Sequence, residues 1–120
     1  DRAKVGHILG RISYRDLSSS AKAELPAVIE IIVKENEERF VEFFNDTPSL
    51  TPRMHSLELI PGIGKRLMFQ ILELRERYPF ESFEDIKERT SLSDPVKLIN
   101  RRVMKELSED EKYNIFTRPV

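Results

Sequence analysis

The 120-residue chain contains no cysteine, which excludes disulfide bonds and thiolate-bound metals. No apolar run approaches the roughly 18 residues of a membrane-spanning helix, so we expect no membrane partner and a soluble, cytoplasmic protein. The only two histidines, His7 and His55, lack the paired spacing of metal ligands. There is no serine or cysteine nucleophile motif, and the carboxylates alternate with lysine and arginine as on helix surfaces. We therefore expect neither catalysis by this chain nor a bound cofactor.

Charge of one sign is not in excess either. The formal net charge is −1, which argues against a strongly basic nucleic-acid binder. The charges are nevertheless unevenly distributed, because most of the charged residues between 24 and 46 are acidic. The cations gather in two short stretches, Lys65-Arg66 and the group Arg101, Arg102 and Lys105. A local basic patch is therefore compatible with the sequence, whereas an extended electrostatic footprint is not expected.

The first half of the chain combines a strand-like start with helical patterning. Residues 4–12 predict a strand, because two glycines interrupt them and their apolar residues form no helical face. Serines at 18–20 are candidate N-caps, and Pro26 is expected near the start of a further helix. Apolar residues then recur at helical spacing, namely Val28, Ile29, Ile32, Val33, Phe40, Val41, Phe43 and Phe44. The pattern breaks at residues 45–51, the best internal boundary.

The second half predicts further helices separated by turn signals. Thr51-Pro52 is expected to begin a helix that runs toward a glycine turn. Another helix follows that turn, and Tyr78-Pro79 ends it. Ser82 and Asp94-Pro95 each begin a helix, and residues 108–111 are expected to cap a final turn. The sequence therefore predicts an all-α body after an N-terminal strand.

The most informative stretch is Leu59-Ile60-Pro61-Gly62-Ile63-Gly64-Lys65-Arg66. Two of the four glycines stand one residue apart, directly before a helical segment. Glycine adopts backbone conformations that a Cβ resists, and it leaves room for another molecule to approach the backbone. The N–H groups of the following helical turn lack intrahelical acceptors and carry positive partial charge. The turn therefore predicts an anion site, with nucleic acid as the polymeric anion. A plain tight turn between packed helices is the alternative interpretation.

Two helices joined by a Pro-Gly-Ile-Gly turn resemble a helix-hairpin-helix motif. The likeness extends through Ile71, Arg75, Pro79-Phe80, Ser82 and Glu84-Asp85-Ile86, and this longer pattern is similar to the tandem domain of competence-type DNA-binding proteins. With residues 22–26, 35–40 and 54–89, the chain resembles an archaeal family, uncharacterised in function, in which an OB-fold precedes a helix-hairpin-helix domain. The resemblance implies a strand remnant of the OB-fold (1–12), a helical extension (13–50), a helix-hairpin-helix domain with a degenerate second hairpin (51–107) and a C-terminal cap (108–120).

The same resemblance implies a non-enzymatic module that contacts the sugar–phosphate backbone of RNA or DNA with little base readout. A phosphate would meet the turn at Gly62, Ile63, Gly64, Lys65 and Arg66, with charge-assisted contacts from the two cations. Additional phosphate contacts could come from four further residues, for which a solvated surface is the simpler interpretation: His55, Arg101, Arg102 and Lys105. In similar motifs the turn carbonyls can also hold a monovalent cation, which this sequence neither supports nor excludes.

Two other functions stay open at this stage. The runner-up is a helical protein–protein interaction domain that docks onto a ribonucleoprotein or another partner through an apolar patch near Phe40–Phe44. Core packing is the better interpretation of these aromatic residues, because their spacing is helical and acids flank them. The third is an accessory domain of a nucleic-acid enzyme whose catalytic domain a partner supplies.

Overall fold

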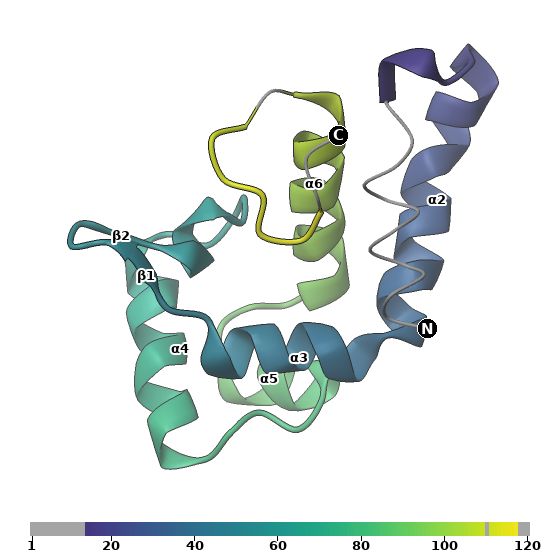
Figure 1. Cartoon of the computed structure of the whole chain (residues 1–120). Helices are drawn as coiled ribbons and strands as arrows, with labels where there is room; N and C mark the ends of the chain where they lie inside the picture. The colour runs from purple at the N-terminus through teal and green to yellow at the C-terminus, as the bar shows by residue number, and fades with distance from the viewer. Residues whose placement is uncertain (1–13, 110, 118–120) are drawn as a thin grey trace.

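A computed structural model of the chain describes residues 14–109 and 111–117 (Figure 1). The elements are η1 (Tyr14–Asp16), α2 (Ser19–Glu35), α3 (Glu37–Asp46), β1 (Ser49–Thr51), β2 (Met54–His55), η2 (Ser56–Leu59), α4 (Lys65–Arg77), α5 (Phe83–Arg89) and α6 (Pro95–Ser108). The strand predicted over residues 1–12 lies outside the described residues. The fold is mostly helical, as predicted, but the pair β1–β2 corrects the all-α expectation. Among the described helices, none is both long and apolar enough to cross a bilayer.

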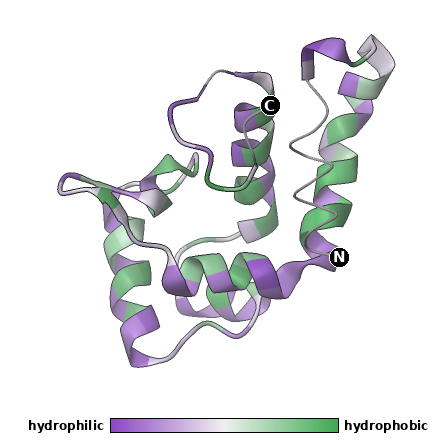
Figure 2. Cartoon of the chain, in the orientation of Figure 1, coloured by the Kyte–Doolittle hydropathy of each residue, from purple (hydrophilic) through white to green (hydrophobic). Residues whose placement is uncertain are grey.

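The core lies where α3, α4, α5 and α6 meet, with α2 packed along α6 (Figure 1). Figure 2 shows hydrophobic and hydrophilic residues alternating along these helices, as amphipathic packing requires. Phe40 and Phe44 are buried and Phe43 packs against them, which confirms core packing for this aromatic cluster. Phe80 is buried as well, whereas Tyr78 is 74% exposed.

The helical extension differs from the prediction in where its helices begin and end. Ser18 caps α2 as predicted, its hydroxyl accepting the amide of Ala21 at 3.1 Å. Pro26 does not begin a new helix but lies inside α2. The break comes at Asn36, whose side-chain amide donates to the carbonyl of Ile32 at 2.8 Å and thereby ends α2. The carbonyl of Asn36 then accepts the amide of Arg39 at 3.1 Å, so α3 begins at once.

The prediction of a helix beginning at Thr51-Pro52 is wrong. Residues 49–55 form a small antiparallel hairpin, and the Thr51 hydroxyl accepts the amide of Arg53 at 3.2 Å inside its turn. Both the amide and the hydroxyl of Ser56 donate to the carbonyl of Pro48, which draws the chain back on itself. A Thr-Pro pair can begin a helix, but it can equally form a tight turn, and Thr51-Pro52 forms the turn of this hairpin. The element before the glycine turn is therefore only the short helix η2.

The starts of α5 and α6 and the end of α4 agree with the sequence prediction. Ser82 caps α5 and Asp94 caps α6, each accepting a backbone amide of the first turn, and α4 ends at Tyr78 before Pro79. The C-terminal segment (111–117) is not a capped helical turn. It packs back against α6, where the Glu106 carboxylate accepts the amides of residues 115–117.

Candidate functional site

The Pro-Gly-Ile-Gly turn lies between η2 and α4 and presents its glycines to solvent. Gly62 has a φ of 97°, in the left-handed region that side chains with a Cβ rarely adopt. Ile63 is 4% exposed, and its amide donates to the carbonyl of Ile60 at 3.0 Å, which closes the turn. A Cβ at Gly62 would lie 2.9 Å from Leu98 of α6, so the turn also packs closely on that helix. The positive φ therefore favours glycine at 62 strongly, and the contact with the end of the Leu98 side chain adds a smaller preference.

Gly64 is required for neither reason. It is the N-cap of α4 with a φ of −89°, and a Cβ there would meet nothing within 4 Å. No side chain among the described residues caps this helix. The first-turn N–H groups therefore donate to no capping side chain of Gly64 and carry the positive partial charge of a helix N-terminus. An anion can approach the backbone here without displacing protein atoms.

Cations surround this helix start, but one of them is already paired. Lys65 donates from Nζ to Glu58 Oε1 at 2.8 Å, and this hydrogen bond is the main reason that the pKa of the Glu58 carboxyl is lowered. Arg66 is exposed beside it. On the other side, Lys97 and Arg101 of α6 line a pocket of about 240 Å³ together with Gly62 and Asp94. The structure thus brings two α6 cations to the turn, of which the sequence interpretation named only Arg101.

His55 is buried, which corrects the expectation of a surface histidine. It is 6% exposed, and its Nδ1 accepts the amide of Leu57 at 3.1 Å, while its own amide donates to Glu58 at 2.9 Å. Burial, followed by the charge of Arg75, lowers the pKa of His55 below its usual 6.5. His55 therefore serves as the neutral N-cap of η2, and we remove it from the phosphate contacts.

Arg102 is a correction of the same kind, because it is 2% exposed rather than on a solvated helix face. Its guanidinium donates to Glu106 at 2.9 Å, Leu59 O at 3.3 Å, Glu111 at 3.0 Å and Tyr113 O at 2.6 Å. Lys105 is half-buried with its Nζ 3.7 Å from the same Glu111 carboxylate. These two cations hold the C-terminal segment (111–117) against α6 and are not arranged around the turn.

Metal-ligating side chains do not cluster among the described residues at this site. Within the part of the chain that the structure describes, no three His, Asp or Glu side chains form a group that could hold a metal ion. The carbonyls of Ile60 and Gly64 already accept the amides of Ile63 and Met68. These contacts do not test the monovalent cation that the sequence neither supports nor excludes.

These features define a small, mostly helical module in which an exposed glycine turn begins a helix. A family model described as "Protein of unknown function (DUF655)" matches residues 1–118, and the chain belongs to this family. The uncharacterized protein MJ0038 of Methanocaldococcus jannaschii is 45% identical over 119 residues, which cover 98% of this chain and 54% of that protein. The crystal structure of Af1531 from Archaeoglobus fulgidus is 48% identical with a TM-score of 0.79, over 88% of this chain and 59% of that one. The chain therefore spans little more than half the length of these archaeal relatives.

Proposed function

We propose that this chain binds the sugar–phosphate backbone of RNA or DNA without sequence preference, through the turn Pro61–Gly64 and the start of α4. The observation that carries the proposal is the uncapped, solvent-facing N-terminus of α4 at Gly64, flanked by Lys65 and Arg66. In this proposal η2, the turn and α4 act as a helix-hairpin-helix motif whose first helix is shortened. We further propose, from the family resemblance alone, that residues 1–12 continue an OB-fold that would add single-strand contacts.

The binding mode follows from the donors that the site offers. Phosphate oxygens would accept the first-turn amides of α4, while Lys65 would exchange the Glu58 carboxylate for a phosphate. Lys97 and Arg101 lie across the pocket and could meet a neighbouring phosphate of the same strand. None of these groups reads a base edge, so the contacts would position the protein without specifying sequence.

The electrostatics predict modest affinity. Glu58 and Asp94 lie within the same surface as the cations and would oppose a phosphate. Each phosphate neutralised contributes a slope of about −0.9 in log K against log salt for duplex DNA, so two or three contacts give a slope of about −2 to −3.

The test is fluorescence anisotropy with labelled single- and double-stranded RNA and DNA, at salt concentrations from about 50 to about 300 mM. Lys65→Glu is expected to weaken binding about tenfold or more, since it replaces a phosphate contact with a repulsive charge. Lys87→Glu on α5 makes the same charge change at another exposed, paired lysine and is expected to change affinity less than about twofold. If none of the four polymers binds at low salt, or both variants lose affinity equally, the proposal is wrong.

A further inference from the structure

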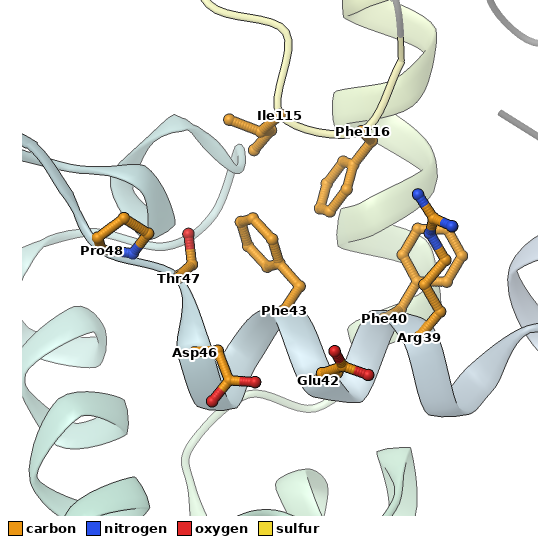
Figure 3. A pocket seen from close by; sticks show the side chains of 9 residues that line it. All are labelled: Arg39, Phe40, Glu42, Phe43, Asp46, Thr47, Pro48, Ile115 and Phe116. Carbon is orange, nitrogen blue, oxygen red and sulfur yellow. The ribbon is translucent and has the colours of Figure 1, made fainter. Parts of the chain in front are cut away.

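A second pocket lies away from the glycine turn, between α3 and the C-terminal segment (111–117), with a volume of about 510 Å³ (Figure 3). Phe43 and Phe116 point toward one another and pack together in its wall, with ring centroids 4.8 Å apart and planes inclined by 56°. Both side chains are only half-buried, and Ile115 beside them is half-buried too. Aromatic surface that the core does not cover therefore forms part of the pocket wall.

The size and lining fit a ligand site better than a packing defect. Pockets that hold ligands span roughly 300–1,000 Å³ and combine apolar walls with a few polar groups. Phe40 closes the base of the pocket, since it is buried and meets Phe116 edge-on at 5.5 Å. The base of the pocket thus belongs to the core, whereas the half-buried rings of Phe43 and Phe116 can still contact a ligand.

The charged residues at the rim of the pocket indicate the charge of a ligand that would bind there. Among the described residues that line the pocket, Glu42 and Asp46 of α3 carry negative charge and Arg39 carries positive charge. Asp46 lies exposed in the last turn of α3, which holds no basic residue of its own, while the Arg75 guanidinium of α4 donates to the carbonyls of Phe44 and Thr47 at the same helix end. The negative faces of the two aromatic rings also attract cations.

We infer that this pocket is a docking site for a basic segment of a partner protein, which lays an arginine or lysine side chain against the exposed parts of the Phe43 and Phe116 rings and pairs it with Asp46. The aliphatic stem of such a side chain suits the aromatic walls, and its charged head suits the rim. The inference is independent of nucleic-acid binding, because the same carboxylates repel phosphate. The chain would then bind an anion at the glycine turn and a cationic segment at this pocket.

The experiment titrates isotopically labelled protein with an acetylated hexapeptide of alternating arginine and leucine, followed by amide chemical shifts. The control probe carries glutamate in place of arginine. Asp46→Lys should leave the fold intact, because a cation at a helix C-terminus is favourable, yet weaken binding of the basic peptide about tenfold. The matched variant Glu38→Lys makes the same charge change outside the pocket and should weaken it less than about twofold. Phe43→Leu keeps an apolar side chain and should weaken it about threefold by removing an aromatic face.

Support requires shifts that centre on Phe43, Asp46 and Phe116 together with this ranking of the variants. The inference is overturned if the basic peptide does not bind, if the acidic peptide binds equally well, or if Glu38→Lys matches Asp46→Lys. Shifts of these residues that depend on protein concentration without peptide would assign the pocket to a second copy of the chain and would also overturn it. Equivalent shifts caused by RNA or DNA would have the same consequence.

Discussion

Replacing Arg102 by methionine should destabilise the protein strongly, because Arg102 is buried and not on the solvated helix face that the sequence suggests. The Glu106 side chain is 0% exposed, so the variant leaves a buried carboxylate without its cation. Breaking a buried pair from one side costs about 3–5 kcal/mol. The amides of Ile115, Phe116 and Thr117 still donate to Glu106, which favours the lower end of that range, about 3 kcal/mol.

The assay is urea unfolding followed by far-ultraviolet circular dichroism, which suits a chain without tryptophan. With a slope of about 1.5 kcal/mol per molar urea, a loss of 3 kcal/mol lowers the midpoint by about 2 M. Arg101→Met is the matched control, because Arg101 is the exposed neighbour on the same helix, and it should change the free energy of unfolding by less than about 0.5 kcal/mol. If Arg102→Met stays within about 1 kcal/mol of this control, the buried pair does not hold the C-terminal segment (111–117) as we describe.

Two further predictions concern the turn and its supporting cap. Gly62→Ala should lower the free energy of unfolding by about 1–2 kcal/mol, because residue 62 has a positive φ and contacts Leu98. Gly64→Ala should change it by less than about 1 kcal/mol. Thermal unfolding measures both changes, and equal effects would contradict the geometry of the turn. The lowered pKa of His55 means that the unfolded chain binds a proton more readily than the folded one, so this residue's contribution is complete above about pH 6.5 and is lost as the pH falls toward its folded pKa. Urea unfolding between about pH 7 and pH 5 should therefore show a slope that shrinks in His55→Asn, whose side chain can still accept the amide of Leu57; an unchanged slope would assign the pH dependence to other groups.

Local signals explain why much of the helical half could be predicted. Ser82, Asp94 and Tyr78-Pro79 act within three or four residues of themselves, through side-chain caps and proline sterics, and tertiary packing did not override them. The hairpin at 49–55 could not be predicted in the same way. Thr51-Pro52 is compatible with either a helix start or a turn, and the choice depends on the bonds from Ser56 to Pro48.

The candidate site divides in the same manner. The conformation of Gly62 and the exposure of Gly64 follow from the short pattern itself, but the exposures of Arg101 and Arg102 do not follow from charge. A helical count would have separated them, since Arg102 lies three residues from Ile99 and four from Glu106, on the buried stripe of α6. The same count places Lys97 one turn before Arg101, on the exposed face. Helical periodicity thus predicts which of the α6 cations are buried, and composition alone does not.

The central claim is that an anion binds the uncapped start of α4, and Gly64 tests it most directly. Gly64→Asp and Gly64→Asn fill the same open space, and both side chains are good N-caps, so both variants should unfold at or slightly above the wild-type temperature. They differ in charge, because only aspartate places a carboxylate where the phosphate would lie. We expect anisotropy titrations to show that Gly64→Asp binds RNA and DNA about tenfold or more weakly than Gly64→Asn. Wild-type affinity in a folded Gly64→Asp variant would contradict the account and identify the turn as architecture alone.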